Sequence, residues 1–175
     1  MSKKTSFILS FSLLVVVSFS YISLSYFIKS FNPKVLGESV QSSVKNTTKK
    51  EYTVTKVIDG DTVVIETGEH IRLIGIDAPE ISKKECYSEE SKKYLSELLE
   101  NKKVKLEKDI SEKDKYGRLL RYIYLEDVFV NERLVEKGFA KAVIYKPDIK
   151  HSNLFEISEN VSQNNKMGMW GSCAN

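Results

Sequence analysis

The chain has 175 residues, of which 41% are hydrophobic and 29% charged, a composition typical of one globular domain with an extension. Its formal net charge of +3 is unevenly distributed: residues 1–50 carry 7 Lys/Arg and 1 acidic residue, whereas residues 51–175 carry 20 Lys/Arg and 23 acidic residues, a balance of −3. A domain of that balance does not hold a polyanion by its overall field, so phosphate recognition would need locally placed cations or a bound metal.

Residues 1–28 are predicted to be an export segment. Residues 6–27 carry no charge and follow Lys3 and Lys4, and a basic start before an apolar run is typical of a signal sequence. About 20 apolar residues span the hydrocarbon layer, and no clear Ala-x-Ala site follows, so a retained signal anchor is favoured over a cleaved signal peptide. A buried core helix is disfavoured because it would be apolar on every face. We expect a chain anchored in the membrane and facing its extracytoplasmic side, or secreted after cleavage.

Residues 29–50 are predicted to be a flexible linker, because Ser, Thr, Lys and Asn are frequent there and no apolar periodicity is sustained. The folded domain is expected over residues 51–175. It contains both cysteines of the chain, Cys86 and Cys173. An oxidising compartment favours a disulfide that closes a long loop, but two free thiols remain the alternative because the sequence gives no distance between them.

Short apolar alternations separated by turn residues predict three consecutive strands. They span residues 52–58, 62–66 and 70–76, with turns at Asp59-Gly60-Asp61 and Thr67-Gly68. Two further strands are predicted over residues 104–107 and 119–125, the second turning at Glu126-Asp127 into residues 128–130.

Three helices are predicted from capping residues and helical spacing of apolar side chains. The first starts with Ser88 as its cap and runs to about residue 101, the second starts with Asn131 and stops at Gly138, and the third runs from Asn153, with Glu156 in a capping box, to Gly168. Five strands with late helices indicate an α+β domain, in which a small closed barrel hides the strand edges.

Acidic residues gather at the predicted ends of two neighbouring strands: Asp59 and Asp61 at the first turn, Asp77 and Glu80 after the third strand. Together they offer an oxygen-rich pocket without nearby His or Cys, which favours a hard cation such as Ca²⁺ over zinc. Taken singly, each group also fits a common hairpin turn or a solvated corner.

Two arginines change this balance. Arg72 lies in an otherwise apolar strand, and Arg118 follows the turn-like stretch Asp114-Lys115-Tyr116-Gly117. Two guanidinium groups can hold a phosphate and stabilise the extra charge of a five-coordinate phosphorus. The alternative is a pair of surface salt bridges, which are common and contribute little.

Four ordered blocks resemble the signatures of the staphylococcal nuclease (thermonuclease) family: Val57-Ile58-Asp59-Gly60-Asp61-Thr62, Arg72-Leu73-Ile74-Gly75-Ile76-Asp77-Ala78-Pro79-Glu80, Asp114-Lys115-Tyr116-Gly117-Arg118 and Val130-Asn131-Glu132-Arg133-Leu134-Val135-Glu136-Lys137-Gly138. The resemblance spans about residues 51–172. It implies a five-stranded barrel of the oligonucleotide-binding (OB) type with three helices. It also implies calcium-dependent cleavage of the 5′ P–O bond in DNA or RNA by a chain expected to be a monomer.

The resemblance also implies roles for individual residues. Asp61, Asp77 and the backbone carbonyl of Ala78 match ligands of Ca²⁺, with Asp59 in the outer shell. Glu80 matches the proposed general base, and Arg72 and Arg118 match the arginines that bind the phosphate and stabilise the transition state. Lys115, Tyr116 and Tyr145 match groups that contact the nucleotide.

The chain departs from the family pattern at three places. Val143 stands where a tyrosine lies beside the nucleotide, the loop after Glu80 is short, and Ala78 replaces a threonine, which is tolerable if the ligand is the carbonyl. Every position with a direct chemical role retains a suitable residue type, which favours an active enzyme. Two alternatives are a membrane-tethered module that binds nucleic acid without cutting it, and a tethered protein-interaction domain.

Overall fold

The computed structural model of the chain describes residues 50–173. The leader expected over residues 1–28 and the linker expected over residues 29–50 lie outside this range, except for Lys50. Among residues 50–173, no helix combines the length and the apolar character needed to cross a membrane.

Five strands form a closed barrel. The sheet order is β3-β2-β1-β5-β6-β7, and a parallel pairing between β3 and β6 closes it. Closure satisfies the backbone groups that an open edge would leave unpaired. The barrel strands are β1 (Glu51–Asp59), β2 (Thr62–Ile65), β3 (His70–Leu73), β5 (Lys103–Glu107) and β6 (Leu119–Leu125). The short β7 (Val128–Phe129) pairs antiparallel with β6, and β4 (Ile76–Asp77) pairs with β8 (Lys141–Ala142) in a separate ribbon.

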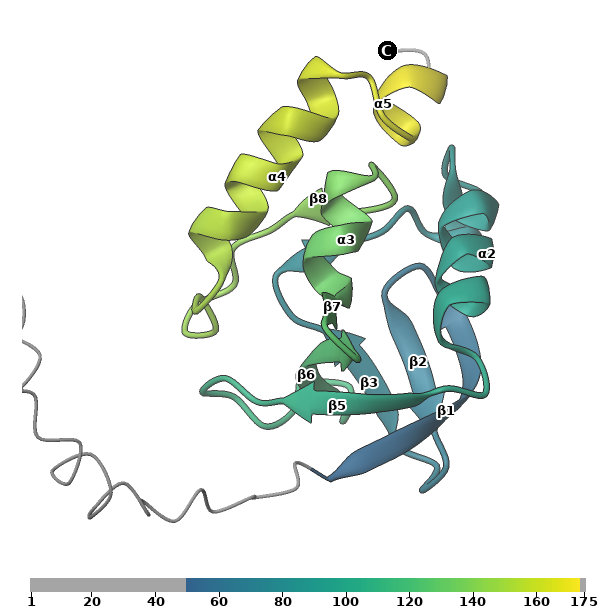
Figure 1. Ribbon diagram of the computed structural model, residues 1–175, viewed down its shortest axis with the longest axis vertical. Coiled ribbons are helices and arrows are strands. Elements are labelled where there is room, and N and C mark those ends of the chain that lie inside the picture. Colours follow the sequence, from purple (N-terminus) through teal and green to yellow (C-terminus); the bar gives the residue numbers. More distant parts are fainter. Residues whose placement is uncertain (1–49, 174–175) are drawn as a thin grey trace, which may run out of the picture. The chain divides into compact units, whose positions relative to one another are not determined.

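Three main helices lie together beyond one end of the barrel, with α3 between α2 and α4 in the view of Figure 1. They are α2 (Ser88–Leu99), α3 (Val130–Glu136) and α4 (Ser152–Asn164); a short α5 (Met169–Ser172) and the 3-10 turn η2 (Ile81–Lys83) complete the described part. The predicted α+β class, with a five-stranded OB-type barrel and three helices, is confirmed.

Alternating side chains of the strands fill the barrel. Val54, Val63, Ile65, Ile71 and Leu73 are all at most 2% exposed, as expected when every second residue of a strand points inward. Burial of each such side chain contributes roughly 1.5–3 kcal/mol relative to an exposed position. This packing fixes the strand ends that carry the polar residues described below.

The third predicted strand is interrupted. The sequence predicts one strand over residues 70–76, but β3 ends at Leu73 and the chain turns at Gly75 before β4. Gly75 has φ +77°, and a Cβ there would lie 2.5 Å from the Phe155 ring, so both the conformation and the space exclude a side chain. The turn sends Asp77 back beside the end of β3.

The predicted helix caps are wrong at α2 and α4. Tyr87, in the left-handed conformation with φ 72°, precedes α2, and Ser88 is already its first, buried residue. His151 precedes α4 without a side-chain cap bond, so Asn153 and Glu156 make no capping box, and α4 ends at Asn164, before Gly168. At both helices a backbone turn directly precedes the first helical residue, and no side chain caps the helix N-terminus.

Asn131 is also not a helix cap. Its Oδ1 accepts the N–H of Ile123 at 3.0 Å, and its Nδ2 donates to the carbonyl of Ile74 at 2.8 Å, within the core. The side chain therefore joins β6 to the segment that follows β3, and Phe129 occupies the position before α3 without a side-chain bond.

Replacing Asn131 should destabilise the domain. In Asn131→Ala the Ile123 N–H and the Ile74 carbonyl lose their buried partner, which should lower the free energy of unfolding by about 2–4 kcal/mol. Denaturant unfolding of the purified protein measures this, with Asn160→Ala on the exposed side of α4 as the matched control. An Asn131→Ala variant as stable as the control would contradict the role.

Candidate active site

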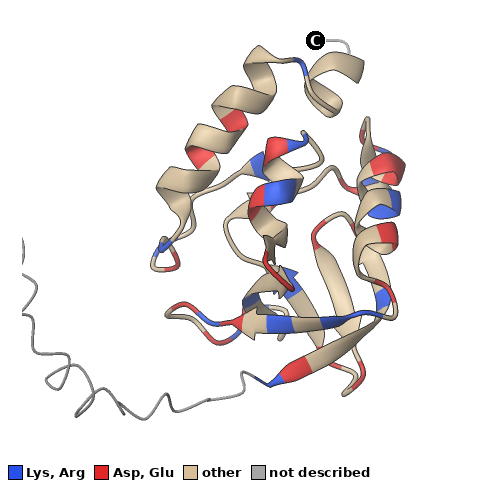
Figure 2. Cartoon of the chain, viewed as in Figure 1, with Lys and Arg blue, Asp and Glu red and all other residues tan. Residues whose placement is uncertain are grey.

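One pocket of about 550 Å³ gathers the ten residues that the sequence assigns to metal, catalysis and nucleotide. The turn between β1 and β2, the ends of β3 and β4, and the loops around residues 114–118 and 145–148 form its wall. The predicted residues in the lining are Asp59, Asp61, Arg72, Asp77, Ala78, Glu80, Lys115, Tyr116, Arg118 and Tyr145. Basic and acidic residues are otherwise interspersed over the described domain (Figure 2), so charge recognition depends on these local groups.

Arg72 is held by two carbonyls and two carboxylates. Its Nη1 donates to the carbonyls of Leu73 and Ile76, each at 2.8 Å. Its Nη2 lies 2.8 Å from Asp77 Oδ1 and 3.0 Å from Asp61 Oδ2. The Arg72 side chain is only 12% exposed, and a buried guanidinium requires such pairing. Its position is therefore fixed relative to both predicted metal ligands.

Asp61 is a buried carboxylate with several donors. The hydroxyl of Thr62 donates to Oδ1 at 3.0 Å, and the Ala78 N–H donates to Oδ2 at 2.9 Å. Burial raises the pKa of the Asp61 carboxyl to about 7, against the attraction of Arg72, and the nearby Asp59 carboxylate adds to the rise. The attraction of Arg72 is therefore not enough to offset the burial of the Asp61 carboxylate. A second cation beside Asp61 would stabilise its ionised form.

The donor chemistry of this corner fits a hard cation. Asp61 and Asp77 share Arg72, and Asp59 Oδ1 accepts the Asp61 N–H at 3.2 Å. The residues that line the pocket include no His or Cys, and carboxylates with backbone carbonyls are the ligands that Ca²⁺ prefers. Among residues 50–173, no three His, Cys, Asp or Glu side chains already stand in a metal-binding arrangement.

Arg118 reaches the same corner from another loop. Its Nε donates to Asp114 Oδ2 at 2.7 Å, and its Nη1 donates to the Thr62 hydroxyl at 3.3 Å. Thr62 in turn donates to Asp61, so it links the second guanidinium to the environment of the first. Although burial works the other way, hydrogen bonds from Arg118 and Tyr116 hold the pKa of Asp114 below its usual value. The two arginines therefore converge on one pocket.

Three residues that support the site were not singled out by the sequence. Thr62 and Asp114 lie inside the signature blocks, but a hydroxyl and a turn carboxylate are too common to mark a support role. Asp148 is 7% exposed, and its Oδ1 accepts the N–H groups of Ile110 and Ser111 at 3.0 and 2.7 Å. It ties the loop before Arg118 to the loop that carries Tyr145.

The remaining predicted groups are more exposed. Tyr116 and Tyr145 are 72% and 65% exposed, and the ammonium of Lys115 lies 5.0 Å from the Tyr116 ring centre. The Glu80 side chain is 51% exposed, and its Oε2 accepts the Ser82 hydroxyl at 3.1 Å. Cys86 and Cys173 lie outside this pocket and form a disulfide in the structure.

Comparisons with known proteins identify the family of the chain. A family model described as "Staphylococcal nuclease homologue" matches residues 70–172. The thermonuclease of Staphylococcus intermedius is 35% identical over 164 residues, 90% of this chain and 90% of that protein. The thermonuclease of Staphylococcus hyicus is 34% identical over 141 residues, 77% of this chain and 83% of that protein. Endonuclease YncB of Bacillus subtilis (strain 168) is 36% identical over 127 residues, 67% of this chain and 60% of that protein.

The fold and the pocket define the class: an OB-type barrel with a charged site at the ends of its strands. The matching family model covers more than half of the chain, and both thermonucleases align over most of it. The chain belongs to the staphylococcal nuclease family, as its sequence blocks predict.

Proposed function

We propose that this chain is an exported, calcium-dependent nuclease that hydrolyses the 5′ P–O bond of phosphodiesters in DNA and RNA. Its broader class, a nuclease that acts on nucleic acid, follows from the family to which it belongs. The observation that carries the finer proposal is the convergence of Arg72 and Arg118 on one pocket with Asp61 and Asp77.

Calcium would be held by Asp61, Asp77 and the carbonyl of Ala78, with Asp59 holding water in the outer shell. When bound, the ion supplies positive charge that neutralises phosphate oxygens and lowers the barrier to attack. The carboxylates of a lining without His or Cys, and the raised pKa of Asp61, support this assignment.

Arg72 and Arg118 would donate hydrogen bonds to the non-bridging oxygens of the scissile phosphate. These oxygens gain charge as phosphorus becomes five-coordinate, so donors already in position stabilise the transition state more than the substrate. Carboxylates of the protein hold both guanidinium groups in place before substrate binds: Arg72 donates to Asp77, and Arg118 donates to Asp114.

Glu80 would act as the general base. Glu80 lines the same pocket, and its carboxylate would accept a proton from the water that attacks phosphorus. The bond from phosphorus to the 5′ oxygen then breaks, and that oxygen takes a proton from solvent. Lys115, Tyr116 and Tyr145 would contact the nucleotide, since all three are exposed and line the pocket.

Calcium dependence is the first test. The purified full chain should degrade both DNA and RNA in calcium, and a chelator should abolish cleavage because the phosphate charge is then not neutralised. Gel analysis of plasmid and RNA digestion measures this. Nucleic acid that is retained but stays intact in calcium would reject the proposal and favour a binding module.

The arginine assignment predicts a graded series. Arg118→Ala should lower kcat by roughly 10²–10³-fold, the usual cost of removing one donor to a developing charge. Arg118→Lys should recover only part of this, because an ammonium lacks the planar fork. Steady-state kinetics measures both variants, with Arg133→Ala as the control, since Arg133 is 40% exposed on α3 and pairs with Glu136 outside the pocket. Equal kcat in Arg118→Ala and the control would remove Arg118 from catalysis.

Export is the remaining part of the proposal. It is motivated by the uncharged run of residues 6–27 after Lys3 and Lys4, and the Cys86–Cys173 disulfide is consistent with an oxidising compartment.

The favoured form is a membrane-anchored enzyme that faces outward. Immunoblots of cell fractions should find the intact chain in the membrane, sensitive to protease added to whole cells. A shortened chain in the culture fluid would instead indicate a cleaved signal peptide, and a chain found only in the cytoplasm would contradict export.

A further inference from the structure

Residues 80–86, called here the Glu80 loop, carry the proposed general base but have almost no hydrophobic anchor. All are exposed except Ile81, which is half-buried. The loop also contains Lys84 in the left-handed conformation, with φ 51°, which a residue with a side chain rarely adopts. Packing therefore does not account for the defined shape of the loop, and other contacts must hold it.

Glu85 makes the contacts that close the loop. Its Oε2 accepts the backbone N–H of Glu80 at 2.8 Å, and its own N–H donates to the Glu80 carbonyl at 3.1 Å. Residues 80 and 85 are thus joined twice, and the bond to a carboxylate is the stronger type. Lys83 Nζ lies 3.7 Å from the Glu80 carboxylate and 3.9 Å from that of Glu85, an exposed arrangement that adds little.

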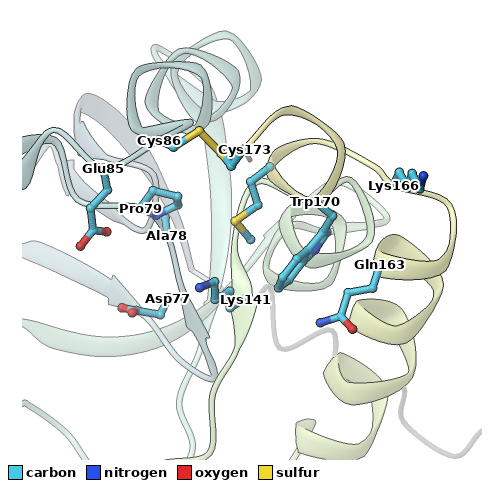
Figure 3. Close-up of a pocket in the computed structure, with 11 residues that line it drawn as sticks. Asp77, Ala78, Pro79, Glu85, Cys86, Lys141, Gln163, Lys166, Trp170 and Cys173 are labelled. Carbon is cyan, nitrogen blue, oxygen red and sulfur yellow. A yellow bond between two sulfur atoms is a disulfide. The ribbon is translucent and has the colours of Figure 1, made fainter. Parts of the chain in front are cut away.

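The next residue, Cys86, ties the loop to the rest of the domain. Its disulfide partner Cys173 directly follows α5, and α5 is itself anchored by buried Met169, whose N–H donates to the Gly138 carbonyl at 3.0 Å. Figure 3 shows the disulfide at the edge of a second pocket, of about 670 Å³. Glu85 and Cys86 line this pocket together with Trp170 of α5. The covalent bond connects the loop to α5 beside this open space.

We propose that Glu85 is a positioning residue that fixes the backbone of Glu80 beside the reaction centre, and that the Cys86–Cys173 disulfide holds Glu85 in place. The inference rests on the proposed role of Glu80. It explains how a short, exposed loop holds the backbone from which the Glu80 side chain projects. It also makes the rate of catalysis depend on the oxidation state of the two cysteines. A dithiol that reduces the disulfide is itself oxidised to a disulfide, and Cys86 and Cys173 become thiols. The Glu80 loop is then held only by hydrogen bonds.

The matched pair Glu85→Ala and Glu85→Gln tests the first part in the full chain with calcium. Glu85→Ala should lower kcat about tenfold at unchanged KM, the loss expected for one hydrogen bond to a charged acceptor, whereas Glu85→Gln keeps an acceptor and should stay close to wild type. Glu97→Ala, an exposed glutamate of α2 paired with Lys93, is the control. Wild-type kcat in Glu85→Ala, or an equal loss in Glu85→Gln, would overturn the assignment.

A second readout does not depend on cleavage. Hydrogen exchange of the Glu80 amide should be about tenfold faster in Glu85→Ala than in wild type, and unchanged in Glu85→Gln and the control. If wild type cuts nothing, the proposed function fails while this exchange pattern still tests the positioning contact. An unchanged amide in Glu85→Ala would overturn it.

The disulfide is tested by reduction and by Cys86→Ser/Cys173→Ser. Well below the unfolding midpoint, dithiol treatment of wild type should lower kcat about tenfold, as for Glu85→Ala. The double variant should be equally slow and insensitive to dithiol. Full activity of the reduced, folded protein would overturn the role of the disulfide.

Discussion

The candidate site depends on one buried guanidinium. Arg72 lies between the buried side chains of Ile71 and Leu73 in β3. Removing its guanidinium from water without partners would cost far more than one hydrogen bond returns. Two carbonyls and two carboxylates compensate by surrounding it. The same contacts fix the turn after β3 and bring Asp77 towards Asp61. The contacts of Arg72 therefore determine both the stability of this turn and the arrangement of the site. Loss of Arg72 would disturb both.

Around this centre, polar side chains connect loops that are distant in the chain. Thr62 connects Asp61 with Arg118, Asp114 folds the turn before Arg118, and Asp148 joins the two outer loops. Each bond involves a charged group and contributes about 1.5–3 kcal/mol. Acting together on a rigid barrel, they hold opposite charges close in a partly dehydrated pocket, where electrostatic effects are stronger than in water.

Much of this organisation could be predicted from the sequence. Alternating apolar residues marked the strands, and the strand ends then located Asp61, Arg72 and Asp77 in one neighbourhood. The parallel pairing of β3 with β6 could not be predicted from local pattern, because register across the barrel is a long-range property. Asn131 was misassigned since asparagine before a helix is usually a cap, while its actual partners lie 8 and 57 residues away. The role of Glu85 could not be predicted, because its residue type does not distinguish it from the other charged residues of the loop.

The disulfide spans 87 residues and joins a loop near the active pocket to the last helix of the described chain. If the chain is exported, as proposed, the bond forms only once both cysteines have left the reducing cytoplasm. A copy that is still in the cytoplasm then lacks the link that holds the Glu80 loop, and its activity on the producing cell's own nucleic acids is lower.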